Sequence, residues 1–178
     1  MSQFREILEK AISNIKDVNG PKNVGAALLD YADELVSKRQ GLSMRGVDGA
    51  PDWYKYETIL WDICRDLIDP IFKDRKWRGW NDLIEAILKL CQNKKYGKGR
   101  QPFVLLLGKI GSIDCICTLR DLIDDDEVSI HSIDSLTKME DLSSYTKIKL
   151  IAEGKKATPQ RSYARKYVKR IEGKRSPE

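Results

Sequence analysis

Apolar residues recur at helical spacing along almost the whole chain, and this periodicity constrains the fold more than any other feature. Between residues 3 and 17 the apolar positions fall three and four apart, and residues 22–39 repeat the pattern. Spacing of this kind gives a helix one apolar face, which must be buried against another element. A chain of 178 residues is long enough to form a helical domain with its own core. The sequence therefore predicts an all-α protein.

Glycine, proline and polar capping residues divide this pattern into separate helices. Asp52 is a predicted N-cap for a third helix, which Pro70 ends or kinks, and Asn81 is a predicted N-cap for a fourth. Glycines and prolines indicate two loops, at residues 40–51 and 93–102.

From residue 102 onward the predicted helices are shorter and follow one another through tight turns. The stretch LLGKIGSIDCICTLRDLIDDDEVSIHSIDSLTKM resembles a HEAT-like repeat, in which glycine ends one helix and an aspartate-rich turn separates the next two. The residues that carry the resemblance are Gly108, Gly111, Ile116, Leu119, Leu122, Asp124, Asp125, Asp126 and Val128. A weaker second copy follows at an offset of about 29 residues, close to the length of a two-helix solenoid unit.

The resemblance covers about residues 102–172 and implies helical hairpins stacked in an array. The alternative is an irregular helical bundle whose apolar spacing imitates a repeat. In either case we expect one helical domain over residues 1–178, with helix pairs in residues 1–92 and the HEAT-like half in residues 102–172.

The chain lacks residue patterns that indicate catalysis or metal binding. His131 is the one histidine, and the sequence assigns it no nucleophile or orienting acid. Cys115 and Cys117 would point in different directions on a helix, and no second pair completes a zinc site. Residues 124–126 lack the spacing of an EF-hand, and GKGR at residues 97–100 is not a P-loop. We therefore expect a non-enzymatic protein with no cofactor and no metal.

Hydrophobicity and cysteine usage predict a cytoplasmic protein. No segment approaches 18 uninterrupted apolar residues, so no membrane span is expected, and the N-terminus is unlike a secretory signal. The four cysteines lie within helical apolar patterns, where thiols are usually reduced core residues.

Basic residues concentrate in the predicted C-terminal helix. The formal net charge of +5 permits nucleic-acid binding without requiring it. Residues 155–175, by contrast, carry nine lysines and arginines against the single acid Glu172. Such a helix can offer a basic stripe to phosphates. The candidate nucleic-acid-binding residues are Arg161, Arg165, Lys166, Lys169 and Arg170.

All four tryptophans fall within residues 53–80. We expect at least two of Trp53, Tyr56 and Trp61 to pack in the core. Trp77, Arg78 and Trp80 lie in a basic segment and are candidate protein-binding residues, because exposed Trp and Arg are enriched at interface hot spots.

A small helical protein without catalytic residues resembles the immunity or antitoxin type of protein, which occludes a partner toxin. The acidic residues Asp121, Asp124, Asp125 and Asp126 would suit the basic cleft of a nuclease toxin. The sequence thus predicts a protein-binding inhibitor whose partner is another protein, such as a toxin domain.

The alternative function is nucleic-acid binding by a HEAT-like protein through the basic C-terminal helix and the tryptophan-containing segment. The resemblance implies relatives that act on damaged DNA bases, with an acid beside aromatic residues in a basic groove. Trp77, Trp80 and Asp82 are the one group in this sequence that matches that pattern.

Overall fold

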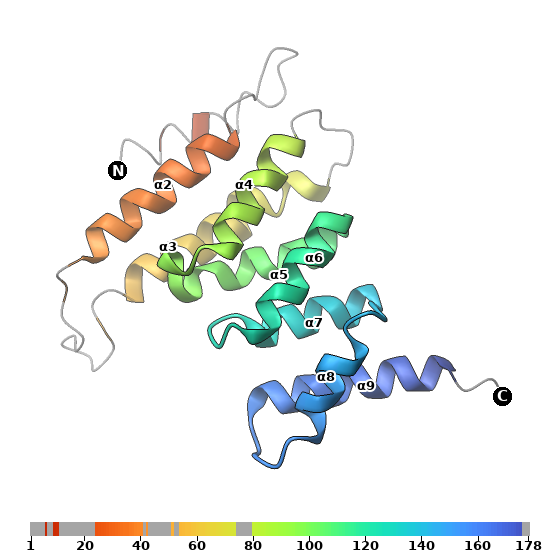
Figure 1. Cartoon of the computed structure of the whole chain (residues 1–178). Helices are drawn as coiled ribbons and strands as arrows, with labels where there is room; N and C mark the ends of the chain where they lie inside the picture. The colour runs from red at the N-terminus through yellow and green to blue at the C-terminus, as the bar shows by residue number, and fades with distance from the viewer. Residues whose placement is uncertain are drawn as a thin grey trace. The chain divides into compact units, whose positions relative to one another are not determined.

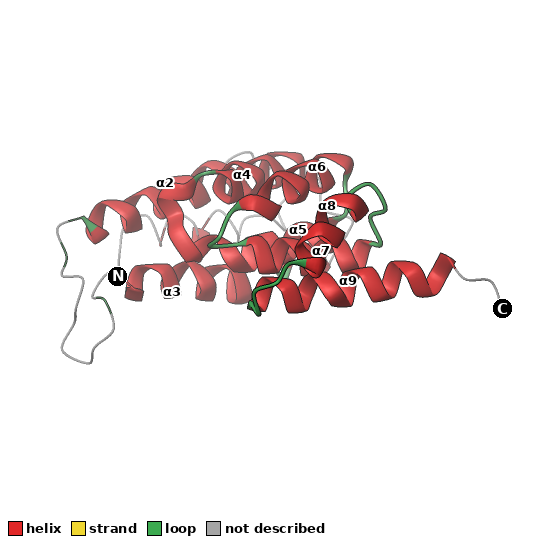
Figure 2. Cartoon of the chain, turned by 60° about the horizontal axis from the view of Figure 1, so that its bottom comes forward, coloured by secondary structure: helices red, strands yellow, loops and turns green. Residues whose placement is uncertain are grey.

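The computed structural model describes residues 6, 9–10, 24–40, 42, 51, 54–73 and 80–175 (Figure 1). Throughout these ranges the regular elements are helices and no strand is present, which confirms the all-α prediction (Figure 2). Most of the expected first helix, the loop at 40–51 and the predicted cap Asp52 lie outside the described residues. None of the described helices is long and apolar enough to cross a membrane.

The chain divides into two compact units, Met1–Phe103 and Val104–Glu178. The first contains α2 (Val24–Arg39), α3 (Tyr54–Ile63) and α4 (Trp80–Gln92). Shorter helical turns follow α3 and α4, namely Cys64–Ile68, Ile71–Lys73 and η4 (Lys94–Arg100), and α5 (Gln101–Ile110) carries the boundary between the units.

The core of the first unit forms where α2 packs against α3 and α4. The apolar stripes predicted from the sequence face inward, with the buried side chains Leu28, Tyr31, Leu35, Leu60, Ile63, Leu83, Ile87 and Leu90. The start of α2 approaches α4 closely, and the Gly25 amide donates a hydrogen bond of 3.0 Å to the Asp82 carboxylate. Asp82 thereby satisfies one of the amides that a helix start leaves without an intrahelical acceptor.

The segment at residues 93–102, predicted as a loop, is instead largely helical. It forms η4 and the start of α5, with Tyr96, Gly97, Gly99 and Arg100 buried. Gly97 has a φ of 55°, and a Cβ there would lie 2.0 Å from Glu57 Oε1. The glycines therefore permit close packing against α3 instead of marking an exposed loop.

The expectation for the aromatic residues of α3 is wrong for the two that are described. Trp61 is 37% exposed and Tyr56 is half-buried, while Leu60 and Ile63 occupy the inner face. The Trp61 indole donates a hydrogen bond of 3.1 Å to the Lys98 carbonyl. A polar partner at the surface thus holds the ring across η4. Trp53 lies outside the described residues.

The second unit consists of helical hairpins. The first pair is α6 (Ile113–Asp121) with α7 (Ser129–Met139), and the second is α8 (Tyr145–Glu153) with α9 (Pro159–Arg175). Helix α7 packs against both α6 and α9. Leu119, Leu122 and Val128 are buried, as the repeat pattern predicts. This arrangement is compatible with a helical repeat and also with a helical bundle.

Small residues on α7 allow the helices of this unit to approach closely. The buried hydroxyl of Ser132 donates to the Leu119 carbonyl of α6, and that of Ser135 donates to the Val104 carbonyl of α5 at 3.1 Å. A Cβ on Gly108 would lie 2.7 Å from the Ser135 Cβ. Each hydroxyl on this face therefore has an acceptor, which burial of a polar group requires.

Candidate functional site

Helix α9 begins and docks as its sequence indicates. Pro159 is its first residue, and the Thr158 hydroxyl accepts a hydrogen bond of 3.1 Å from the Arg161 amide. Ala164, Tyr167 and Ile171 are fully buried or nearly so. This stripe fixes the helix against the rest of the unit, so the basic residues on the other side face outward.

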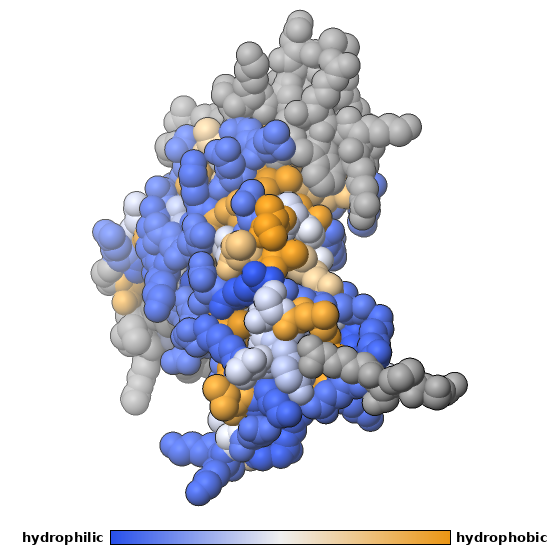
Figure 3. Space-filling model, turned by 45° about the vertical axis from the view of Figure 1, so that its right-hand side comes forward, coloured by the Kyte–Doolittle hydropathy of each residue, from blue (hydrophilic) through white to orange (hydrophobic). Residues whose placement is uncertain are grey.

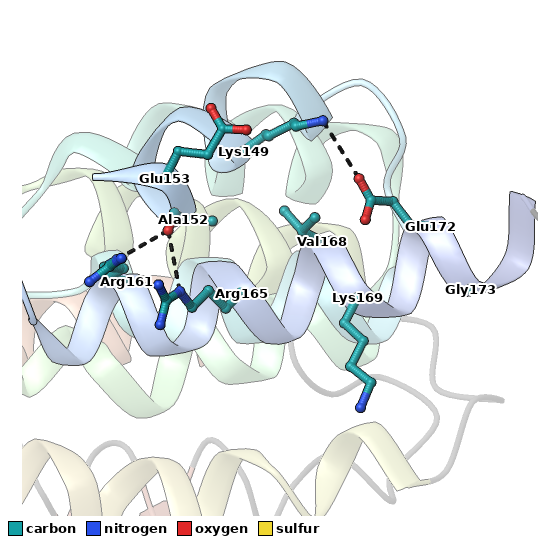
Figure 4. Close-up of a pocket in the computed structure, with 9 residues that line it drawn as sticks. All are labelled: Lys149, Ala152, Glu153, Arg161, Arg165, Val168, Lys169, Glu172 and Gly173. Carbon is teal, nitrogen blue, oxygen red and sulfur yellow. Dashed lines mark hydrogen bonds and ion pairs between the residues drawn. The ribbon is translucent and has the colours of Figure 1, made fainter. Parts of the chain in front are cut away.

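An open groove of ≈ 830 Å³ lies between α8 and the outward side of α9 (Figure 4). Arg161, Arg165 and Lys169 recur at intervals of four residues along it. The groove also contains two carboxylates, Glu153 and Glu172, and Lys149 lies 3.6 Å from the latter. Its full lining is Lys149, Ala152, Glu153, Arg161, Arg165, Val168, Lys169, Glu172 and Gly173.

A second groove, of ≈ 550 Å³, shares the same three basic residues and contains no acidic side chain. It is lined by Ala157, Thr158, Pro159, Arg161, Ser162, Arg165, Lys166 and Lys169. The predicted residues Arg161, Arg165, Lys166 and Lys169 are thus brought together, and this group is called the α9 basic surface below. The second groove thus combines these four positive charges with the hydroxyl groups of Thr158 and Ser162.

Arg161 and Arg165 are oriented by a single backbone atom. The Nε atoms of both side chains donate to the Ala152 carbonyl, at 3.1 and 3.4 Å respectively (Figure 4). Ala152 stands in the last turn of α8, where carbonyls have no intrahelical donor and carry partial negative charge. Among the described residues neither guanidinium has a carboxylate partner.

Arg170, the fifth predicted residue, is engaged elsewhere. It lies 2.8 Å from Glu140, which also binds Lys174 at 2.6 Å. These two cations, Lys174 first, lower the pKa of Glu140. Lys166 lies over the Tyr163 ring, 4.9 Å from its centroid. The basic helix therefore has one side partly neutralised by Glu140 and another side, the α9 basic surface, that forms no ion pair with an acid in the described structure.

The acidic turn is only partly available to a partner. Asp121, Asp124 and Asp126 are exposed, and Asp124 pairs with Lys147 at 2.6 Å. Asp125 is buried, and its carboxylate accepts a hydrogen bond of 3.1 Å from the Glu127 amide. Asp125 therefore stabilises the turn before α7, and three of the four predicted acidic residues face solvent.

The tryptophan-containing segment contributes little that can be described. Trp77 and Arg78 lie outside the described residues, and Trp80 is described only as the first backbone position of α4. Asp82, the acid of that group, binds the start of α2 through the Gly25 amide. The predicted cluster of Trp77, Trp80 and Asp82 is therefore known here by the position of Asp82 alone.

The histidine and the two cysteines of the C-x-C pair differ in their burial. Burial lowers the pKa of His131 and raises the pKa of the Cys115 thiol. Cys117 is exposed on α6, facing away from the buried Cys115 as predicted for this spacing. Within the described ranges no group of His, Cys, Asp and Glu residues is placed to hold a metal ion.

Sequence reasoning found the basic residues but missed what arranges them. The acceptor for Arg161 and Arg165 is a backbone carbonyl at the end of α8. The type of residue that carries a carbonyl does not indicate such a contact. Glu140 is likewise distant in sequence from Arg170, and only the fold brings the two side chains together. Comparison of the chain with protein-family models, curated proteins and solved structures gives no match.

Proposed function

We propose that the chain is a non-enzymatic nucleic-acid-binding protein whose α9 basic surface contacts the sugar–phosphate backbone. The observation that carries this proposal is the acid-free groove shared by Arg161, Arg165 and Lys169. Cations gathered without carboxylate partners bind polyanions by releasing condensed counterions. At about 1.5 Å of rise per residue, Arg161 to Lys169 spans about 12 Å, enough to follow several phosphates.

The proposed mode of binding is independent of base sequence. The residues that line the two grooves include no aromatic ring, so neither groove offers a platform on which bases could stack. Arginine, lysine and hydroxyl groups instead match phosphate oxygens. Phosphate contacts position a protein on nucleic acid without specifying its sequence.

Fluorescence anisotropy with a labelled DNA duplex of mixed sequence tests the proposal. We expect the triple variant Arg161→Gln, Arg165→Gln, Lys169→Gln to bind at least about tenfold more weakly. The slope of log affinity against log salt concentration should become shallower by about two to three, since each lost phosphate contact contributes about 0.9. A control variant with the same charge loss, Lys55→Gln, Lys94→Gln, Lys98→Gln, uses three exposed lysines of the first unit. Equal weakening by both variants would contradict a localised site.

A protein-binding inhibitor of the immunity type is the second proposal. Asp121 and Asp126 are exposed and have no cationic partner among the described residues, so they could meet a basic cleft. The buried Asp125 and the Asp124–Lys147 pair make this face less acidic than the sequence indicates. Affinity purification of wild type and an Asp121→Lys, Asp126→Lys variant, each after nuclease treatment, tests it. Loss of one stoichiometric partner from the variant alone would support the inhibitor.

Two finer proposals concern architecture and compartment. The hairpins α6–α7 and α8–α9, with α7 packed on α9, support a HEAT-like relationship for about residues 102–172. All four cysteines are free thiols, and three of them are buried, which supports a reducing, cytoplasmic location. Neither proposal is required for the α9 basic surface to bind nucleic acid.

A further inference from the structure

Two arginine side chains of α9 converge on one acceptor, and their arrangement is more specific than a general basic surface. Arg161 and Arg165 stand one helical turn apart, and each donates its Nε–H to the Ala152 carbonyl. In Figure 4 both guanidinium groups turn toward this oxygen and lie beside each other at the groove. The two hydrogen bonds to one acceptor orient both guanidinium groups toward the same point of the groove.

This arrangement brings two like charges together without a neutralising carboxylate. One carbonyl at the end of α8 contributes only a fraction of a negative charge, whereas the two side chains carry a full positive charge each. The terminal Nη atoms of both arginines have no acceptor in the described structure. Each guanidinium therefore keeps the donors of its terminal nitrogens, which lie in one plane, available to a ligand.

We propose that Arg161 and Arg165 form a clamp for a single phosphate group. The inference deepens the proposed function, on which it depends only for the source of that phosphate. A tetrahedral phosphate offers acceptor oxygens in several directions, so it can receive hydrogen bonds from two guanidinium groups at once.

The acidic residues define the side from which the phosphate enters. Glu153 of α8 and Glu172 of α9 both line the first groove, and their carboxylates make it less favourable for an anion than a groove lined by the same arginines without acids. The adjoining groove has no acidic lining and adds Lys166, Lys169 and the hydroxyl groups of Thr158 and Ser162. The phosphate therefore binds from this second side, and Lys169, one further turn along α9, lies in position for the next phosphate of a chain.

Replacement of the two arginines by lysine tests the clamp without altering the charge. The Arg161→Lys, Arg165→Lys variant keeps both charges but loses the planar donors and the paired Nε hydrogen bonds. We expect about tenfold weaker binding of the labelled DNA duplex at moderate salt. The matched control Arg170→Lys changes an arginine that already pairs with Glu140, and should bind as wild type does. Circular dichroism melts establish that each variant is folded.

The same experiment separates the clamp from the broader proposal. If the double lysine variant binds the duplex as tightly as wild type while Arg161→Gln, Arg165→Gln does not, the clamp is wrong and nucleic-acid binding stands. A second measurement uses inorganic phosphate alone as the probe. Side-chain Nε–Hε resonances of Arg161 and Arg165, assigned by single substitutions, should shift together in nuclear magnetic resonance spectra.

Two further outcomes are decisive for the source of the phosphate. Inorganic phosphate could shift both resonances while the protein does not bind the duplex. That result would retain the clamp and overturn nucleic-acid binding in favour of a small phosphorylated ligand. Absence of any shift, with duplex binding that is indifferent to both double variants, would overturn the clamp.

Discussion

The guanidinium of Arg120 on α6 binds both carboxylate oxygens of Asp141, which lies in the turn between α7 and α8. The distances are 3.2 Å from Nε to Oδ2 and 2.5 Å from Nη2 to Oδ1. Asp141 also accepts hydrogen bonds from the Ser143 hydroxyl and from the amide and hydroxyl of Ser144. Its backbone carbonyl accepts the hydroxyl of Tyr167 on α9. One aspartate thus connects both hairpins of the second unit.

Replacement of this aspartate should destabilise the second unit substantially. Asp141→Asn keeps the size of the side chain but removes its charge and one acceptor oxygen, so Arg120 loses its charged partner and keeps the Ser143 hydroxyl. Because the Asp141 side chain is only 6% exposed, we expect a loss of roughly 2–3 kcal/mol in the free energy of unfolding. Urea denaturation followed by circular dichroism measures it. Lys138→Gln, which removes an exposed i,i+4 pair with Asp134, should change stability by less than about 0.5 kcal/mol.

The stability that Asp141 contributes should depend on pH. Although burial alone would raise it, hydrogen bonds from Arg120, Ser144 and Ser143 hold the pKa of Asp141 well below its ordinary value. A lowered pKa in the folded state gives stability that is complete above the unfolded value, about 3.9, and is lost as the pH falls toward the folded value. The stability difference between wild type and Asp141→Asn should stay constant from about pH 7 to pH 5 and shrink below about pH 4. A difference that instead grew on acidification would contradict this assignment.

Local sequence signals predicted parts of the second unit well, because the start of α9 and the buried positions of its first hairpin are marked by recognisable residues. Thr158 and Pro159 mark the start of α9, and Leu119 and Leu122 are buried as the periodicity indicates. Such signals depend on neighbours along the chain, which the sequence displays directly.

The errors arose where residues distant in sequence determine the environment. Gly97 and Gly99 have the composition of a loop, but α3 packs so closely that a Cβ on Gly99 would lie 2.7 Å from the Leu60 Cδ1. Asp124 and Asp125 are adjacent and chemically identical, yet one is exposed and the other buried. The role of the Ala152 carbonyl as an acceptor for two arginines cannot be inferred from the alanine side chain. Pairings of this kind follow from tertiary packing, which periodicity does not encode.

Two glycines in helices should respond in opposite ways to substitution by alanine. In Gly25→Ala the new Cβ would lie 2.5 Å from the Asp82 carbonyl oxygen and 3.0 Å from the Ala86 Cβ, so α2 and α4 must separate. Gly173 has nothing within 4 Å of such a Cβ, and Gly173→Ala should gain about 0.5–1 kcal/mol from helix propensity. We expect Gly25→Ala to lose about 1–3 kcal/mol, as overpacked sites do. Thermal melts compare the pair, and equal shifts would contradict the close contact at Gly25.

Arg100 should be among the most sensitive positions of the first unit. It is fully buried, and it donates hydrogen bonds of 3.1 Å to the Cys91 carbonyl and 2.9 Å to the Gly97 carbonyl. Arg100→Ala would leave these carbonyls without that donor and open a cavity, with an expected loss of about 3–5 kcal/mol. The exposed neighbour Lys98 provides the control, because Lys98→Ala keeps its carbonyl bond to Trp61. Urea midpoints of the two variants should therefore differ clearly.

Glu140 should restrain nucleic-acid binding by holding two cations of α9. Its carboxylate pairs with Arg170 and Lys174, and its pKa is lowered by both, Lys174 first. Glu140→Gln removes the negative charge and releases both cations, so we expect the duplex to bind a few-fold more tightly at low salt, with a steeper salt dependence. The matched variant Glu85→Gln removes a carboxylate that pairs with Lys89 in the first unit. If the duplex binds along helix α9, only Glu140→Gln strengthens binding appreciably. An equal gain from both variants would mean that the duplex responds to net charge alone, and would place the binding site elsewhere.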